Sequence, residues 1–566
     1  MDPRSTPATV AEAYLALLRD RGVDRLFVNA GTDFAPVVEA YARRKESSLD
    51  FPEPIVCTHE NLAVSMAHGA YLASGHPQAV MLHTNVGTAN AICAVINASR
   101  DRIPIMVTAG RTPLFERPVL GARSSSIHWG QEMYDQGGML RELVKWDYEL
   151  RDGVQVDHVV DRALNVSMAQ PRGPVYLTLP REVLARPADP ATLGPRVTAV
   201  PTEPYPSQAS VSELADLLVK ARFPMVVVTA SGLDHRSVVA LERLCERFAI
   251  GVLEVKPRCY NVSPSHRMHL GYDGRSAFDE ADVVCVLDVD VPWVTATMRP
   301  AEGAVVVQCG PDPSFTQYPM RTHRADLAIT AGTQCLLEML LSTLAERPPV
   351  DEARRSRIER VASAERRRRE ALVVAELESG GRITKAFMNR ALAEVLPTDA
   401  TVVNEYWARP EQLPIRDPGS YFGTPVAGGL GWALPAALGI RLAQPERTVV
   451  ATLGDGAYLF ANPAACHDAM AMHNLPVLTI VCANRKWGAV ELSTLGMYPT
   501  GHTAAAGELT PLARLNRTAA FERYAQASGG HGEAVTDPDE LVPALRRALH
   551  AVRVEHRQAL VNVACD

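Results

Sequence analysis

Short apolar runs alternate along this chain with longer segments in which apolar residues recur every three or four positions. In the first 190 residues the runs lie at 25–29, 55–57, 79–82, 103–108 and 175–179. Short runs bounded by turn-forming residues are typical of buried strands, and strands that alternate with helices favour a parallel sheet covered on both faces. We therefore predict an α/β unit here.

Two helices of this unit have clear boundaries in the sequence. The first is expected to start at a cap formed by Thr6-Pro7 and to run to about Asp20, where Gly22 ends it. The second is expected from Glu60 to Ser74, because Gly75-His76-Pro77 interrupts the helical pattern there.

The alternation recurs twice more. Strand-like runs occur at 225–229, 251–253, 283–287 and 304–308, and again at 448–452 and 477–481. A proline-rich stretch at 186–206 and a polar segment at 346–378, which we predict to be a solvated linker helix, separate the units. The sequence thus predicts three doubly wound parallel-sheet domains, at 1–185, 205–345 and 380–566.

Composition and charge exclude several classes of protein. The chain of 566 residues has a net charge of −7, so it carries no basic excess that would bind nucleic acid. We find no apolar run near the roughly 20 residues that span a bilayer, so no membrane association is predicted. Ten cysteines without a CxxC pair are expected to be reduced, as in a cytoplasmic protein.

Oxygen-bearing side chains follow two of the predicted strands in the last domain. Asp455, within Gly454-Asp455-Gly456, comes after the run 448–452, and Asn484 comes after the run 477–481. The carboxyl ends of parallel strands share one edge of a sheet, where such folds bind ligands. Carboxylate and amide oxygens suit Mg²⁺ or Ca²⁺, and glycines allow phosphates to approach the backbone.

This arrangement resembles the diphosphate-binding motif of thiamine diphosphate (ThDP) enzymes, the superfamily of acetolactate synthase, benzoylformate decarboxylase and pyruvate decarboxylase. The likeness extends over nearly the whole chain. It implies that Mg²⁺ is held by the side chains of Asp455 and Asn484 and by the backbone carbonyl of Lys486. The family usually has two adjacent asparagines where this chain has Ala483-Asn484, and the following Trp487-Gly488-Ala489 aligns Asn484 with the ligating one.

The resemblance also implies residues that surround the rest of the cofactor. Glu60 is expected to hydrogen-bond the aminopyrimidine ring, and Leu430 is expected to lie between the two rings of ThDP. The predicted cofactor-binding residues are Gly31, Thr32, Glu60, Gly429, Leu430, Gly454, Asp455, Gly456, Ala457, Asn484, Lys486, Trp487 and Gly488.

In this superfamily the cofactor supplies a carbanion and an electron sink, so polar side chains near it select the reaction. His83, in the turn 83–90, resembles a histidine of benzoylformate decarboxylase, but the second histidine of that enzyme has no counterpart at 289–295. Glu491 resembles a carboxylate of bacterial 2-hydroxyacyl-CoA lyases. The predicted catalytic residues are Glu60, His83, His128, Gln131 and Glu491.

Three hypotheses about the reaction follow, in this order. The first is a 2-hydroxyacyl-CoA lyase that yields formyl-CoA and a ketone or aldehyde, with a CoA thioester as substrate. The second is a 2-oxo acid decarboxylase like benzoylformate decarboxylase. The third is an acetolactate-synthase-like carboligase, the only case in which we expect FAD.

The resemblance also implies an oligomer. Glu60 and the diphosphate site lie in different domains, and in this superfamily the two meet across a subunit interface. We therefore expect a homodimer, or a homotetramer built as a dimer of dimers, acting on a small-molecule substrate.

Overall fold

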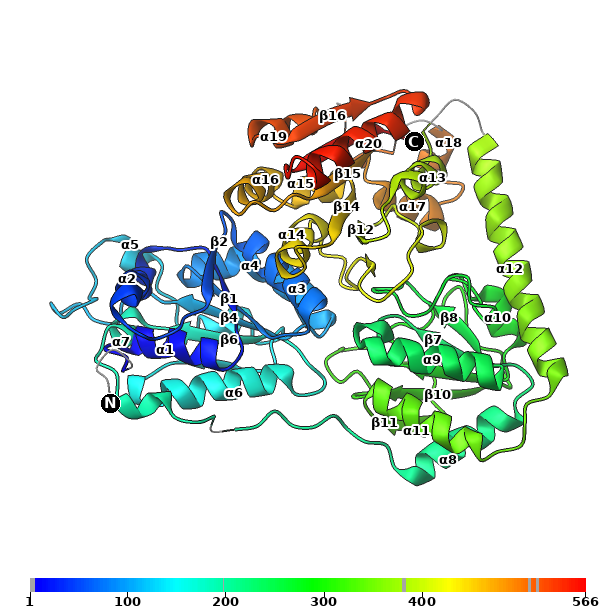
Figure 1. Cartoon of the computed structure of the whole chain (residues 1–566), viewed down its shortest axis with the longest axis horizontal. Helices are drawn as coiled ribbons and strands as arrows, with labels where there is room; N and C mark the ends of the chain where they lie inside the picture. The colour runs from blue at the N-terminus through cyan, green and yellow to red at the C-terminus, as the bar shows by residue number, and fades with distance from the viewer. Residues whose placement is uncertain (1–5, 197, 379–382, 507–509, 516–518) are drawn as a thin grey trace.

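The computed structural model describes residues 6–196, 198–378, 383–506, 510–515 and 519–566. The chain forms three α/β lobes, each built on a parallel sheet, which confirms the predicted fold class (Figure 1). Residues 1–5 and 380–382, at the starts of the predicted first and third domains, lie outside the described residues. Within the described ranges, no helix combines the length and the apolar character needed to cross a bilayer.

The first lobe contains a six-stranded sheet in the order β2-β1-β3-β4-β6-β5. Its elements are α1 (Val10–Asp20), β1 (Arg25–Val28), α2 (Ala35–Arg43), β2 (Glu53–Val56), α3 (Glu60–Ser74), β3 (Gln78–Leu82), α4 (Thr84–Arg100), β4 (Ile105–Gly110), α5 (Ile127–Gly130), β5 (Asp147–Glu149), α6 (Val156–Met168), β6 (Val175–Leu179) and α7 (Arg181–Leu184). The predicted bounds of α3 and β6 are confirmed. The predicted cap of the first helix is wrong, because Thr9 rather than Thr6 accepts a backbone hydrogen bond at its start.

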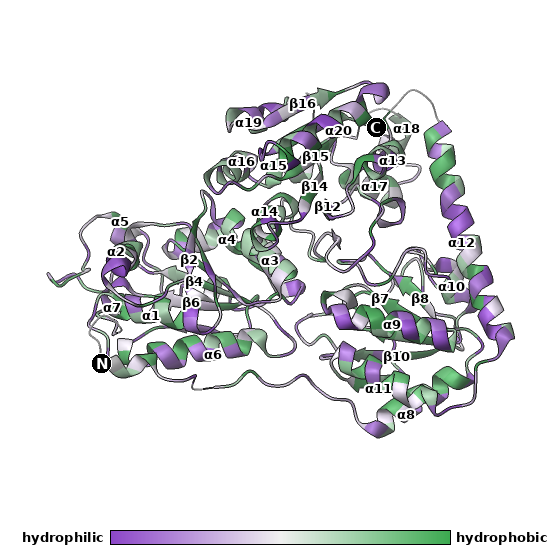
Figure 2. Ribbon diagram, viewed as in Figure 1, coloured by the Kyte–Doolittle hydropathy of each residue, from purple (hydrophilic) through white to green (hydrophobic). Residues whose placement is uncertain are grey.

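The middle lobe contains a five-stranded sheet in the order β11-β10-β9-β7-β8. Its elements are α8 (Gln208–Lys220), β7 (Pro224–Val228), α9 (His235–Phe248), β8 (Gly251–Glu254), α10 (Arg275–Glu280), β9 (Val283–Leu287), β10 (Val305–Gly310), β11 (Leu327–Thr330) and α11 (Thr333–Ala345). The long helix α12 (Glu352–Glu378) then leads to the third lobe (Figure 1). Most of α12 is hydrophilic (Figure 2), but it is not fully solvated, because Arg354, Ile358, Ala362 and Glu365 are buried.

The third lobe contains a six-stranded sheet in the order β13-β12-β14-β15-β17-β16. Its elements are α13 (Lys385–Val395), β12 (Ala400–Glu405), β13 (Tyr421–Phe422), α14 (Ala433–Ala443), β14 (Thr448–Gly454), α15 (Asp455–Phe460), α16 (Pro463–Met472), β15 (Leu478–Ala483), α17 (Gly488–Met497), α18 (His502–Ala506), α19 (Glu522–Ala527), β16 (His531–Val535), α20 (Pro538–Arg553) and β17 (Ala559–Ala564). The rank order of its strands is the same as in the first lobe.

The first and third lobes share one hydrophobic core, in which α3 lies against α14 (Figure 1). The two helices touch backbone to backbone. A Cβ atom added to Gly69 would lie 2.0 Å from the carbonyl oxygen of Ala436, and one added to Gly439 would lie 1.9 Å from that of Met66. Glycine at both positions is therefore what lets the lobes approach so closely.

One pair of cysteines corrects the expectation that all ten thiols are reduced. Cys482 and Cys565 form a disulfide, with their Cα atoms 5.9 Å apart. Cys482 lies on β15 and Cys565 directly follows β17, its neighbour in the sheet, so strand pairing brings together residues 83 positions apart. The other eight cysteines are free.

Candidate active site

A histidine and a buried carboxylate form a pair at the carboxyl edge of the first sheet. His83 follows β3, and Asp33 follows β1. Nδ1 of His83 lies 2.5 Å from Oδ1 of Asp33, whose other oxygen accepts a hydrogen bond from the Thr84 N–H at 3.3 Å. The hydrogen bond that the His83 ring donates to Asp33 raises the pKa of His83.

Two glycines make room for this pair. A Cβ atom on Gly31 would lie 2.1 Å from Nδ1 of His83, and one on Gly110 would lie 1.9 Å from Oδ2 of Asp33. Gly31, predicted to bind the cofactor, thus has a defined packing role against His83. Asp33 was not among the predicted site residues, although a charged residue that directly follows a strand and a turn was a usable signal.

Glu60 begins α3 close to this pair. Its side chain is only 13 % exposed, and Nδ2 of Asn90 donates a hydrogen bond to its Oε2 at 3.1 Å. The charge of Glu60 also contributes to the raised pKa of His83. The structure therefore brings Glu60, His83 and Asp33 into one electrostatically coupled group, whereas Thr32 is exposed and offers its carbonyl to Arg181 at 3.4 Å.

The other two residues predicted in this region lie on or beside α5. His128 is buried, and its Nδ1 accepts a hydrogen bond from the Ser124 N–H at 3.1 Å. Burial and the charges of Arg181 and Arg123 lower the pKa of His128, so its imidazole is neutral at pH 7. Gln131 is partly exposed, and its side chain forms no hydrogen bond to any residue that the structure describes.

A second group of polar residues lies at the carboxyl edge of the third sheet. Asp455, at the start of α15, accepts hydrogen bonds from the N–H groups of Gly456 at 2.8 Å and Arg485 at 2.7 Å. The Asp455 carboxylate is buried, and burial raises its pKa. Asn484 follows β15, and its Oδ1 accepts a hydrogen bond from the Lys486 N–H at 3.2 Å.

Lys486 lies in a short antiparallel bridge to Arg514. The bridge uses the N–H of Trp487, which donates to Ala513 at 2.7 Å, and the carbonyl of Arg485, which accepts from Leu515 at 2.8 Å. No described residue donates a hydrogen bond to the Lys486 carbonyl, so this oxygen is available to a ligand.

The donor chemistry of this group fits a hard cation that also contacts phosphate oxygens. One carboxylate, one amide oxygen and one carbonyl are oxygen donors of the kind that Mg²⁺ prefers. Across the described ranges, no cluster of three or more His, Cys, Asp or Glu side chains could hold a metal. A metal here would therefore depend on the amide and the carbonyl, and on oxygens of its ligand.

The glycines of this segment differ in their surroundings. A Cβ atom on Gly454 would meet open space, whereas one on Gly456 would lie 3.0 Å from the Trp487 ring. Ala457 is buried in the next turn. Gly488 begins α17 directly after Trp487.

The loop that holds Leu430 is supported by a carboxylate that the sequence analysis missed. Glu405, fully buried at the end of β12, accepts hydrogen bonds from the N–H groups of Gly431 and Ala433, both at 2.8 Å. Burial raises the pKa of Glu405 to about 7. Leu430 is half-buried against the shared core.

Gly429 uses its own backbone groups within the chain. Its N–H donates to Oδ1 of Asn97 at 3.0 Å, and its carbonyl accepts from Nδ2 of Asn97 at 2.8 Å. The Gly429 N–H is therefore paired within the chain, whereas its carbonyl oxygen, which accepts one hydrogen bond, keeps a second lone pair for a ligand.

Glu491 lies on α17 next to the diphosphate-side group. Its Oε2 accepts a hydrogen bond from Nζ of Lys486 at 2.6 Å, and its Oε1 accepts one from the Thr510 hydroxyl at 3.4 Å. The side chain lines a cavity of about 280 Å³ together with Asn484 and Arg514. The predicted acid–base residue is thus an ion-paired carboxylate.

Two family models match the chain. The N-terminal TPP binding domain of thiamine pyrophosphate enzymes matches residues 8–139, and the C-terminal TPP binding domain matches residues 404–563. These ranges hold the Glu60 group and the Asp455 group respectively.

Curated relatives and solved structures agree with these models. The chain is 30 % identical to benzoylformate decarboxylase of Pseudomonas aeruginosa over 513 residues, covering 85 % of this chain and 87 % of the relative. It is 25 % identical to acetolactate synthase isozyme 3 large subunit of Escherichia coli over 582 residues, covering 98 % and 94 %. The fold matches that of a 4-hydroxybenzoylformate decarboxylase of Rhodococcus jostii with a TM-score of 0.77, at 24 % identity and 99 % coverage of both chains. The protein belongs to the thiamine pyrophosphate (thiamine diphosphate) enzyme family.

Proposed function

We propose that this ThDP-dependent enzyme decarboxylates a 2-oxo acid with an aryl or branched side chain. The observation that carries the proposal is the Asp33–His83 pair beside Glu60, in turns that resemble those of benzoylformate decarboxylase. The 30 % identity to a benzoylformate decarboxylase supports it. We therefore rank the decarboxylase above the 2-hydroxyacyl-CoA lyase, which the sequence analysis ranked first.

The roles of the residues follow from their positions. When bound, ThDP would supply a nucleophilic carbon and an electron sink for the decarboxylation. Glu60 would bind the aminopyrimidine ring, and Asp455, Asn484 and the Lys486 carbonyl would hold Mg²⁺ on the diphosphate. His83, whose pKa is raised by Asp33, would donate a proton from Nε2 at the reacting carbon or its oxygen.

The 2-hydroxyacyl-CoA lyase is the second candidate, and Glu491 is the observation in its favour. This carboxylate is 26 % exposed and lines the cavity beside Asn484. Its ion pair with Lys486 fixes the direction of the carboxylate. A carboligase similar to acetolactate synthase is third, on the basis of a relative of lower identity.

Three parallel incubations of the enzyme with ThDP and Mg²⁺ distinguish the candidates. We expect benzoylformate to give benzaldehyde and CO₂, with the loss of this activity in Glu60→Gln. A 2-hydroxyacyl-CoA formed from formyl-CoA and acetone, or acetolactate formed from pyruvate, with no turnover of benzoylformate, would reject the proposal in favour of the second or third candidate.

We also propose that each complete site contains the first lobe of one subunit and the third lobe of another. The hydrogen bonds of Glu60 and of Asp455 that the structure describes stay within their own lobes. Apolar side chains are exposed close in sequence to each group, including Val86 at 44 % and Leu492 at 73 %. Contact with a partner subunit would remove this apolar surface from water.

A subunit-mixing experiment tests this arrangement. Glu60→Gln and Asp455→Ala homodimers are both expected to be inactive. After unfolding and refolding together, random pairing would restore about a quarter of the wild-type activity, because half the dimers are mixed and each mixed dimer has one intact site. If both halves of the site came from the same chain, every site would stay broken and no activity would return.

A further inference from the structure

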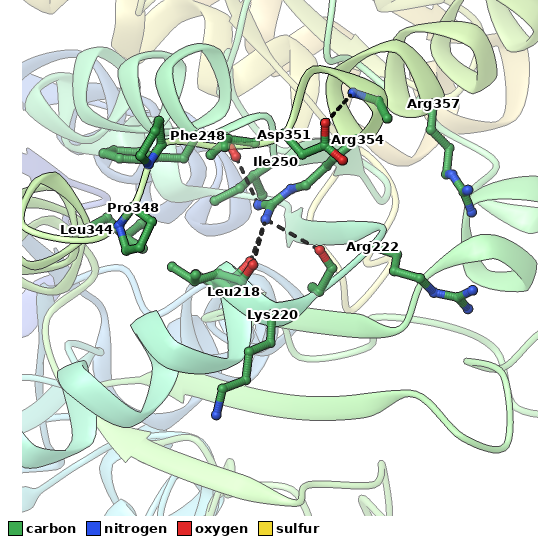
Figure 3. A pocket seen from close by; sticks show the side chains of 15 residues that line it. Leu218, Lys220, Arg222, Phe248, Ile250, Leu344, Pro348, Asp351, Arg354 and Arg357 are labelled. Carbon is green, nitrogen blue, oxygen red and sulfur yellow. Dashed lines mark hydrogen bonds between the residues drawn. The ribbon is translucent and has the colours of Figure 1, made fainter.

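The middle lobe contains a cavity of about 410 Å³ that no step of the proposed reaction uses (Figure 3). It lies at the amino edge of the sheet, because Arg222 lies two residues before β7 and Ile250 directly precedes β8. The ends of α8 and α9 and the first turn of α12 form its walls. Its volume is in the range of small-molecule sites.

The base of this cavity is a buried cation. Arg354 is 7 % exposed and donates to the carbonyl oxygens of Leu218 at 2.7 Å, Phe248 at 2.9 Å and Ala249 at 3.0 Å. These carbonyls belong to the last turns of α8 and α9, so one guanidinium caps both helices. Burial lowers the pKa of Arg354 to about 10, and it therefore stays charged at neutral pH.

Three further cations line the cavity, and two of them have no counter-ion among the described residues. Lys220 and Arg357 form no ion pair with any residue that the structure describes, and Nε of Arg222 lies 3.8 Å from Asp282. The lining includes one carboxylate, that of Asp351, which accepts a hydrogen bond from the Ala353 N–H at 3.0 Å. The cavity therefore has a positive charge that the chain itself does not neutralise.

The opposite side of the cavity is apolar. Figure 3 shows Phe248, Leu344 and Pro348 on one side of the Arg354 guanidinium and Arg222 and Arg357 on the other. A ligand that fits both sides has a charged end and a carbon skeleton.

We propose that this cavity binds a small organic dianion, carrying either a phosphate group or two carboxylates. Arg222, Arg357 and Lys220 would pair with its charged groups, and Phe248, Leu344 and Pro348 would contact its carbon skeleton. Cations are well suited to such ligands because charge-assisted hydrogen bonds are stronger than neutral ones. The site is separate from the active site, since its residues all come from the middle lobe and α12.

Isothermal titration calorimetry on the enzyme saturated with ThDP and Mg²⁺ tests the proposal. Glycerol 3-phosphate and succinate are the two charged probes, and glycerol is the neutral control. We expect saturable binding of at least one dianion and none of glycerol. The affinity should fall as salt is added, because these cations are partly exposed.

Three substitutions locate the bound ion. Arg357→Gln and Lys220→Gln are each expected to weaken binding at least tenfold. Arg360→Gln, an exposed position on the next turn of α12 and outside the cavity lining, should leave it unchanged. Thermal unfolding of each variant shows whether it is folded.

Three results would overturn the proposal. They are the absence of saturable binding for both dianions, affinities unaffected by both lining substitutions, and loss of binding in Asp455→Asn, which would assign the ion to the cofactor site.

Discussion

The first and third lobes are built on sheets with the same rank order of strands, yet their carboxyl edges carry different chemistry. The residue after the third strand in chain order is His83 in the first sheet and Asp455 in the third. At the first edge, a base and two carboxylates can move protons. At the third edge, oxygen atoms can hold a cation. In both lobes the sheet places the site at its carboxyl edge, and the side chains at that edge determine the chemistry of the site.

The two edges also differ in how their functional groups are held. In the first lobe, these groups are held by hydrogen bonds between side chains, as in the Asp33–His83 and Asn90–Glu60 contacts. In the third lobe, Asp455 and Asn484 accept hydrogen bonds from backbone N–H groups. A side-chain network can share charge among titrating groups, whereas backbone donors fix the direction of the oxygens that a metal needs.

The largest effect is expected from removing the carboxylate of the first edge. Glu60→Gln should lower kcat/KM by about 10² to 10⁴-fold, because it removes an acid–base group from the reaction. ThDP binding, followed by tryptophan fluorescence, should change much less, since the diphosphate-side group is intact. Glu53→Gln, an exposed position on β2, is the control. If Glu60→Gln were as active as the wild type, the first edge would not supply the acid–base group of the reaction.

The corresponding change at the third edge should act on binding. Asp455→Asn removes the only carboxylate of the proposed metal site, and we expect the affinity for Mg²⁺ to fall by more than about 100-fold, the upper effect of substituting residues around metal ligands. Titration of the ThDP-saturated protein with Mg²⁺ measures this directly. Asp468→Asn, exposed on α16, should behave as wild type. Unchanged affinity in Asp455→Asn would show that metal does not bind here.

A smaller effect, on pH dependence, is expected for the residue that supports His83. Asp33 raises the pKa of His83, so Asp33→Asn should lower it. If protonated His83 is the active form, activity in the variant should be lost at a lower pH than in the wild type as the pH rises. Glu60 also acts on His83 and is unchanged.

The pH–rate profile and the NMR titration of the His83 imidazole are the measurements for this prediction. Glu39→Gln, exposed on α2, is the control. If Asp33→Asn loses activity at the same alkaline pH as the wild type, Asp33 is not the group that positions His83 and raises its pKa.

The smallest effect concerns stability in the third lobe. The pKa of Glu405 is about 7 in the fold and its ordinary value in the unfolded chain is lower. As the pH rises, Glu405 therefore ionises in the unfolded chain before it ionises in the fold. Between these two pKa values the free energy of unfolding falls by at most about 1.4 kcal/mol per pH unit.

In Glu405→Gln the pH-dependent part of the free energy of unfolding that comes from Glu405 is absent. The amide NH₂ group also faces one of the two backbone N–H groups, where an acceptor is needed, and this mismatch costs about 1 to 3 kcal/mol. We expect the wild type to be more stable at pH 5, by an amount that shrinks toward pH 8. Urea unfolding at both values tests this, with Glu411→Gln, half-exposed, as control. A difference independent of pH would contradict the raised pKa.

Several central strands could be predicted from the sequence because they are continuous apolar runs, although β12 and β17, which are also central, were not predicted. The predicted bounds 175–179 and 283–287 are those of β6 and β9. The edge strands β5 and β16 were missed, because their residues are polar and half-buried and leave no apolar run. The start of the first helix was misplaced by three residues, since Thr6 and Thr9 are both capping residues and only the fold selects Thr9.

By itself, the sequence determined three parallel-sheet lobes and the family. It also placed Asp455 and Asn484 at strand ends, because both are encoded in local apolar patterns and short motifs. Only the tertiary structure decided the Asp33–His83 pair, the Glu405 support, the Cys482–Cys565 disulfide and the cation-lined cavity. These features join residues from different strands and helices, and their partners are chosen by sheet order and helix packing, which no local pattern of residues specifies.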